Sequence, residues 1–222
     1  MRVTKMRSNF SMIGNFVSFL KENEQRIKNM LLDYTVQSGM EKLPSGEEVK
    51  TLLFQKENVH IRFLPVRIDF DYVYANANCT SEKALESAYQ FFRLFGEIFY
   101  QVSANRIAFV TSGFLDNANH QAVETLTKTF GIAALFGDCQ EFSLRLNNVK
   151  NYFEPLNSVL DIRAGEAKNA KTNQTLPVLI VNIDVNTLAA NKENRFQADK
   201  MEQYLSDLVL EEEDKIRIIE SL

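Results

Sequence analysis

The sequence predicts an α+β protein with a mostly antiparallel sheet, or sheets, and helices packed on one face. Three observations favour this class. Helical and strand-like segments do not alternate regularly, no glycine-rich turn leads from a strand into a helix, and the strands have one apolar and one polar face. Residues 142–147, FSLRLN, show this alternation most clearly. Such strands are typical of an antiparallel sheet with one covered face.

The first predicted element is an amphipathic helix at residues 12–33. Its apolar residues recur at spacings of three and four, with charged residues between them. Gly39 and the sequence PSG at 44–46 predict a loop. Two strands follow at residues 49–56 and 59–76, joined by a tight turn at 57–58. Pro65 interrupts the second strand, which indicates an edge position or a bulge.

The strongest helical pattern begins after residue 80. Thr80 or Ser81 can act as the N-cap, and Glu82 lies in the first turn, where the helix dipole favours a negative charge. An apolar stripe rich in phenylalanine then runs to Val102. It is too short and too wide for a typical coiled-coil seam, so it favours a core helix that lies on a sheet.

The remaining elements are a strand at residues 106–115, a helix at 117–130, three strands and a last helix. The three strands cover residues 141–149, 158–164 and 176–186, with a polar loop at 165–175. The last helix begins near Arg195, and Glu212 and Lys215 interrupt its apolar stripe. The order is therefore α-β-β-α-β-α followed by β-β-β-α. A boundary near Gly137 divides the chain into halves 1–136 and 137–222, which could also form one continuous domain.

Two segments resemble a known family. The sequence NRIAFVTSGFLD follows the aromatic helix, and LPVLIVNIDVNTL precedes the last helix. Over about residues 60–222 the chain resembles an uncharacterised, sporadically distributed bacterial family of similar length. Ala108, Thr111 and Asn182 stand where that family has a glycine, an arginine and an aspartate. The resemblance implies a two-part α+β bacterial protein and brings no activity with it.

Composition excludes several classes of protein. The chain has 45% hydrophobic residues, 24% charged residues and a net charge of −4, which suits a globular protein better than one that coats nucleic acid. Cys79 and Cys139 predict buried free thiols. With only His60 and His120 besides, and no CxxC or HExxH spacing, structural zinc is not expected. The basic residues 1–21 lack a cleavage site and the length of a membrane span, so a cytoplasmic protein without a membrane anchor is predicted.

The sharpest enzymatic hypothesis uses Asp69, Asp71 and Asp184. Paired carboxylates on neighbouring strands hold Mg²⁺ in many phosphoryl- and nucleotidyl-transfer enzymes. Arg67 shares the face of Asp69 and Asp71, however, so the pair also fits a partly neutralised, solvated sheet face. Whether Asp184 lies opposite the pair decides between the two interpretations.

Other chemistries have weaker signals. A nucleophile made of Cys139 and His120 is not favoured, because the neighbouring Asp138 would raise the pKa of the thiol. Nucleic-acid binding by exposed aromatic residues is an alternative, but Tyr72 and Tyr74 lie on the face expected to be buried.

The sequence favours a non-enzymatic bacterial protein that works through protein–protein contacts. Abundant phenylalanine and the interrupted apolar stripe of the last helix predict a protein partner and self-association as a homo-oligomer. The family resemblance implies a defence, toxin–antitoxin or phage-related system. No cofactor is expected, except Mg²⁺ under the alternative of a phosphoryl- or nucleotidyl-transfer enzyme; a nucleic-acid-binding accessory protein is the second alternative.

Overall fold

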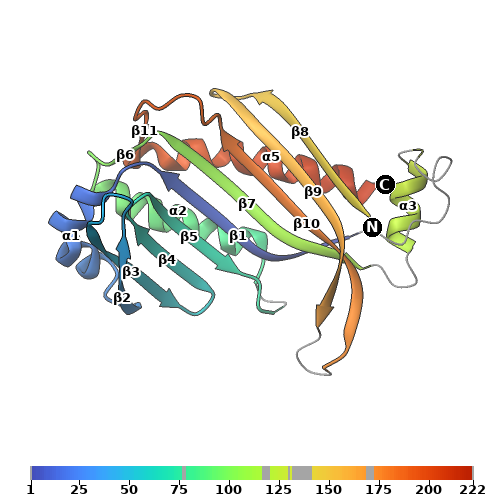
Figure 1. Cartoon of the computed structure of the whole chain (residues 1–222), viewed down its shortest axis with the longest axis horizontal. Helices are drawn as coiled ribbons and strands as arrows, with labels where there is room; N and C mark the ends of the chain where they lie inside the picture. Colours follow the sequence, from blue (N-terminus) through green and yellow to red (C-terminus); the bar gives the residue numbers. More distant parts are fainter. Residues whose placement is uncertain are drawn as a thin grey trace.

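A nine-stranded antiparallel sheet forms the centre of the protein (Figure 1). The computed structural model describes residues 2–76, 79–116, 121–129, 131, 142–168 and 173–221. The strand order is β2-β3-β4-β5-β1-β7-β10-β9-β8, and every neighbouring pair is antiparallel. The strands are β1 (Val3–Ile13), β2 (Thr35–Lys42), β3 (Glu48–Lys56), β4 (Val59–Leu64), β5 (Arg67–Val73), β7 (Arg106–Asp116), β8 (Ser143–Asn151), β9 (Pro155–Lys168) and β10 (Thr175–Thr187).

Helices accompany this large antiparallel sheet, which confirms the α+β class. They are α1 (Val17–Met30), α2 (Ser81–Ile98), α3 (Gln121–Thr129) and α5 (Met201–Ser221), the last preceded by the short 3₁₀ helix η2 (Ala198–Lys200). Figure 1 shows α2 and α5 behind the strands. A small second sheet pairs β6 (Ser103–Ala104) with β11 (Phe196–Gln197).

The aromatic helix α2 packs on the sheet, as its stripe predicts. Its N-cap is Thr80, whose hydroxyl accepts a hydrogen bond from the backbone N–H of Lys83 at 3.3 Å. Phe91 of α2 stacks on Phe70 of β5, with 5.6 Å between ring centroids. Phe95 lies 6.0 Å from the ring of Phe63 on β4. The stripe is therefore the core of this part of the chain and not a coiled-coil seam.

The last helix buries its apolar stripe inside the chain. α5 packs against β1, β7, β9 and β10, and Leu205, Leu208 and Ile219 are almost fully buried. Glu212, predicted to interrupt the stripe, is itself buried. The stripe is thus already covered by this chain's own sheet, and the predicted self-association needs another surface.

Two parts of the chain follow the same path through the sheet. In each, a central strand leads to a helix, a series of strands returns to pair with that central strand, and a long helix follows. The first path runs from β1 to α2 and the second from β7 to α5. Because β1 and β7 pair antiparallel, an approximate twofold rotation normal to the sheet relates the two paths.

The N-terminal region differs most from the sequence prediction. Residues 3–13 form the central strand β1, and the helix begins only at Val17. Polar residues on both faces hide this strand in the sequence, since Lys5 and Ser8 point to the helix side and bind Glu212 and Thr111. The loop predicted around Gly39 is largely the edge strand β2.

Other boundaries are corrected more modestly. Pro65 lies in a turn that divides the predicted strand 59–76 into β4 and β5, while the tight turn at 57–58 is confirmed. β9 and β10 extend into the predicted loop 165–175, and α5 begins six residues after Arg195. The predicted boundary at residues 136 and 137 lies outside the described residues. The sheet continues across it, since β7 pairs with β1 on one side and β10 on the other.

One finding concerns membranes. Among the residues that the structure describes, no helix is long and apolar enough to cross a membrane.

Candidate functional site

Strand β5 separates its side chains between the two faces of the sheet. Phe70 points to α2, and Asp69 and Asp71 alternate with it along the strand. The two carboxylates therefore lie on the side away from α2 and α5, which we call the open face. Cross-strand neighbours share a face, so Ser11 lies beside Asp69 and Asn9 beside Asp71.

Asp71 is bound by two arginines and an asparagine. Its Oδ1 accepts hydrogen bonds from Nε of Arg7 at 2.7 Å and from Nδ2 of Asn9 at 2.9 Å. Its Oδ2 lies 2.9 Å from Nη2 of Arg62 on β4. These donors reach the carboxylate from both neighbouring strands.

Asp69 has a similar set of partners. Its Oδ1 accepts a hydrogen bond from the hydroxyl of Ser11 at 2.6 Å. Its Oδ2 lies 2.9 Å from Nε of Arg67 and 3.0 Å from Nη2 of Arg62. Arg62 therefore bridges the two carboxylates.

We call Arg7, Arg62, Arg67, Asp69 and Asp71 the arginine–aspartate cluster. The carboxylates are buried, with relative exposures of 0% for Asp69 and 2% for Asp71, whereas the side chains of Arg7 and Arg67 are 47% and 42% exposed. The guanidinium groups outnumber the carboxylates, which leaves one positive charge in excess. The buried carboxylates hold these arginine side chains in place while leaving them accessible to solvent. The arginines therefore lose little side-chain conformational entropy when a ligand binds.

The cluster corrects one interpretation of the sequence and confirms another. Asp69 and Asp71 are not a solvated pair, because arginine side chains cover them. The ion pair between Arg67 and Asp69 is present, as their shared face indicates. The parts of Arg7 and Arg62 in the cluster were not predicted, because these residues come from other strands, β1 and β4. The alternation of opposite charges in RIDFD and the arginine in the neighbouring HIRF were the available signals.

Asp184 does not meet the other two aspartates. It lies on β10, and strands β1 and β7 separate β10 from β5. The row Asp71, Asn9, Val110, Asp184 crosses the sheet through successive strand pairs. At a strand spacing of about 4.8 Å, Asp184 is roughly 14 Å from Asp71. Ions of a two-metal site are about 4 Å apart. No group of three or more His, Cys, Asp or Glu side chains suited to a metal ion occurs in the described part of the chain.

Further arginines extend the polar character of the open face. Arg106 of β7 donates from Nε to the carbonyl oxygen of Thr187, and Arg145 of β8 lies 3.5 Å from Asp161 of β9. Arg163 of β9 is exposed. Two lysines of the same sheet point to the helix side instead. Lys5 binds Glu212 of α5, and Lys50 binds Glu24 of α1.

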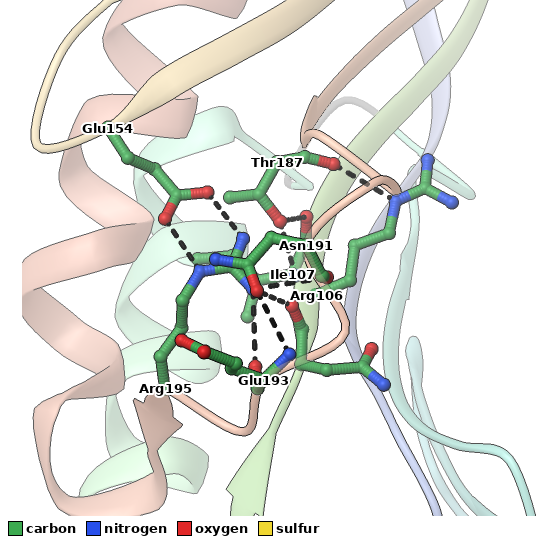
Figure 2. Close-up of polar contacts among 8 residues, drawn as sticks. Arg106, Ile107, Glu154, Thr187, Asn191, Glu193 and Arg195 are labelled. Atoms are coloured by element: carbon green, nitrogen blue, oxygen red, sulfur yellow. Dashed lines mark hydrogen bonds and ion pairs between the residues drawn. The ribbon is translucent and has the colours of Figure 1, made fainter.

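A second polar cluster, drawn in Figure 2, is centred on Arg195. Its Nε and Nη2 bind the two carboxylate oxygens of Glu154 at 2.8 and 2.7 Å. Its Nη1 donates to the carbonyl oxygens of Asn105, Asn191 and Glu193. The guanidinium also lies over the ring of Phe196, 4.4 Å from its centroid. Every nitrogen of this arginine is thus engaged, so the cluster fastens the β10–α5 connection to the sheet and offers a ligand little.

Two adjacent glutamates on α5 are buried in opposite environments. Burial raises the pKa of Glu212, and the nearby Lys5 ammonium, 2.9 Å away, only partly offsets this. Burial also acts on Glu211, but hydrogen bonds from Ser158, Tyr152 and Lys215 outweigh it and lower the pKa of that carboxyl. Burial and the hydrogen bond to Glu211 raise the pKa of Tyr152 to about 12. These groups connect α5 to the strands beneath it.

A large cleft lies elsewhere, between α1, α2 and the β3–β4 turn. It has a volume of about 730 Å³ and is lined by Tyr34, Tyr72 and Phe91 among others. Two of its five charged residues, Lys56 and Asp33, lie 3.6 Å from each other. Tyr72 is buried and Tyr74 half-buried, as the sequence predicts, so neither offers a stacking ring on the open face.

The cysteine and histidine predictions are tested only in part. Cys79 is a free thiol, half-buried, whose sulfur accepts a hydrogen bond from Asn58 at 3.0 Å. His60 lies on β4 opposite Asp71, on the polar side as expected. Cys139 and His120 lie outside the described residues.

Comparison with other proteins adds no assignment. No protein-family model matches the chain, and no curated protein matches it. The resemblance of NRIAFVTSGFLD and LPVLIVNIDVNTL to a sporadically distributed bacterial family stays a prediction.

Proposed function

We propose that this chain is a non-enzymatic interaction and assembly protein, and that its open face binds a partner protein. One observation carries this proposal: exposed arginines are held in fixed positions by the buried Asp69 and Asp71. Arginine is among the residues that contribute most to protein interfaces. Prior ordering of its side chain reduces the entropy lost on binding.

The mixed charge of the open face favours a protein over a nucleic acid. Asp161 and Asp184 lie on the same face as Arg145 and Arg163, and carboxylates repel a polyphosphate backbone. A protein partner can place its own acidic and basic groups against both signs. The net charge of −4 supports the same choice. A bacterial defence, toxin–antitoxin or phage-related system and a cytoplasmic location remain part of this proposal.

The metal-dependent phosphoryl- or nucleotidyl-transfer enzyme remains the alternative function. It would need Mg²⁺ at Asp69 and Asp71, whose oxygens are occupied by arginine, serine and asparagine. Titration calorimetry with Mg²⁺ or Mn²⁺ separates the two functions. A binding signal that Asp71→Asn abolishes would replace the interaction role by the enzymatic one.

The interaction role is tested by reversing charge on the open face. Arg145→Glu with Arg163→Glu changes two exposed arginines that lie outside the cluster. The matched control is Lys83→Glu with Lys192→Glu, which gives the same change in net charge on exposed residues elsewhere. The tagged chain is isolated from its own cell, and the protein that it retains is purified and titrated against each variant.

We expect the open-face variant to bind this protein at least about tenfold more weakly than the wild type, which is 1.4 kcal/mol. The control variant should bind as the wild type does, and both variants should unfold at the same urea concentration. Equal binding by all three chains, or equal loss in both variants, would contradict the proposal. Retention of nucleic acid that depends on the arginines would favour the second alternative, an accessory protein that binds nucleic acid.

A further inference from the structure

The edge strand β2 is exposed along nearly its whole length. Within the described residues it pairs only with β3, and α1 packs on β3 and β4 without covering it. Val36 and Met40 are 42% and 60% exposed. Val36 lies opposite the buried Phe54 and so on the helix side of the sheet. An edge with exposed apolar residues, no proline and no bulge is a template for another strand.

The register identifies which backbone groups of β2 point outward. The N–H of Leu43 donates to the carbonyl oxygen of Glu47 at 2.8 Å, so this pair is hydrogen-bonded. Hydrogen-bonded pairs alternate along an antiparallel ladder. The odd-numbered residues of β2 therefore bond to β3. Val36, Ser38, Met40 and Lys42 direct their N–H and C=O groups away from the sheet.

These outward groups match a second copy of β2. If two copies pair antiparallel about Ser38, Val36 of each lies opposite Met40 of the other, and the exposed apolar residues cover each other. In the same register Glu41 meets Thr35 and Lys42 meets Tyr34, so no like charges are opposed. A register shifted to Gly39 would place Val36 against Lys42 instead. Self-complementarity of this kind is the requirement of a twofold interface.

We propose that two copies of this chain associate through β2, antiparallel about Ser38, into one continuous sheet. The proposal deepens the assembly role proposed above. It rests on the proposed assembly role, but it uses different residues, which belong to the sheet edge and not to the open face. The occupant of the edge is thus a second copy of the same strand.

Proline substitution tests the edge directly. Ser38→Pro removes an outward N–H, so it costs β2 no bond to β3 but blocks the centre of the interface. Asn147→Pro is the matched control on the opposite edge strand β8. There the N–H of Ala164 donates to the carbonyl of Phe142, so Asn147 also points its N–H outward. Light scattering then measures the mass of each chain.

We expect the wild type and Asn147→Pro to have twice the chain mass of 25.5 kDa, and Ser38→Pro to have the chain mass. A monomeric wild type at about 100 μM, far above a micromolar dissociation constant, would overturn the proposal. Dissociation by Asn147→Pro but not by Ser38→Pro would overturn it as well. The Arg145→Glu, Arg163→Glu variant should remain dimeric, which separates failure of this interface from failure of the open face.

A disulfide trap tests the register. In the proposed register Gln37 of one copy lies opposite Gly39 of the other in a non-hydrogen-bonded pair, whose Cα atoms are about 4.5 Å apart and whose side chains are close enough for a disulfide. In a chain with Cys79→Ser and Cys139→Ser, Gln37→Cys with Gly39→Cys should therefore form a covalent dimer under mild oxidation. Equally efficient crosslinking through Gly39→Cys alone would mean that the register is wrong.

Discussion

The strand pairs β1–β5 and β7–β10 occupy equivalent places in the two paths of the chain, yet they carry different charges. Ser11 of β1 lies opposite Asp69, and Ser112 of β7 lies opposite Asn182. Both serines donate to their neighbour, at 2.6 and 2.8 Å. A serine donor on the first strand is thus common to both pairs, while the acceptor on the neighbouring strand is a carboxylate in one pair and an amide in the other.

The next strand explains how each pair balances its charge. Arg62 of β4 stands beside Asp69, and Asp161 of β9 stands beside Asn182. Arg62 neutralises charge beside Asp69 and so permits two buried carboxylates on β5. Asp161 would repel a carboxylate at the position of Asn182 on β10. The arginine–aspartate cluster is therefore a property of one half of the sheet and not of the fold.

The largest difference should appear when the aspartates at equivalent positions are removed. Asp71→Ala removes the carboxylate that binds Arg7 and leaves Arg62 with Asp69 alone, and we expect a loss of about 3 kcal/mol in the free energy of unfolding. Asp184→Ala removes a half-buried carboxylate that accepts a hydrogen bond from the neutral amide of Asn186, and we expect a loss below about 1 kcal/mol. Urea unfolding measures both. Equal losses would mean that the arginines contribute nothing to stability.

A smaller difference should separate the two serines. Ser11→Ala removes a hydrogen bond to a buried carboxylate, and bonds to charged groups are worth about 1.5–3 kcal/mol. Ser112→Ala removes a bond to the neutral Asn182, worth about 0.5–1.5 kcal/mol. We expect Ser11→Ala to be the more destabilising by about 1 kcal/mol in urea unfolding. In the Asp69→Asn background this excess should disappear, and its persistence would show another cause.

Local signals in the sequence predicted the elements that have strong patterns. The cap at Thr80 and the phenylalanine stripe predicted α2, and alternating residues predicted β8. Strand β1 was missed because its buried face carries Lys5 and Ser8, which only distant residues satisfy. Strand β2 was missed because an exposed edge needs no apolar alternation.

The candidate site was predictable only in its local part. Arg67 and Asp69 are two residues apart, so their shared face and charge balance follow from the strand period alone. Arg7 reaches Asp71 across 64 residues of sequence, and the order of strands decides that contact. Strand order also separates Asp184 from the pair, which no spacing within one segment could reveal.

The smallest expected effect is a pH dependence that contrasts Glu212, which binds β1, with Glu211, which binds β9. The folded-state pKa of Glu212 lies above its ordinary value of 4.5, so its contribution to stability is present below pH 4.5 and is lost as pH rises through the folded pKa. The pKa of Glu211 is lowered, so its contribution is present above pH 4.5 and is lost as pH falls through the folded pKa. In urea unfolding across this range, the free energy of unfolding of Glu212→Gln should increase relative to the wild type as pH rises. That of Glu211→Gln should increase relative to the wild type as pH falls. Parallel profiles would mean that the two carboxyls share one environment, against the opposite partners found for them.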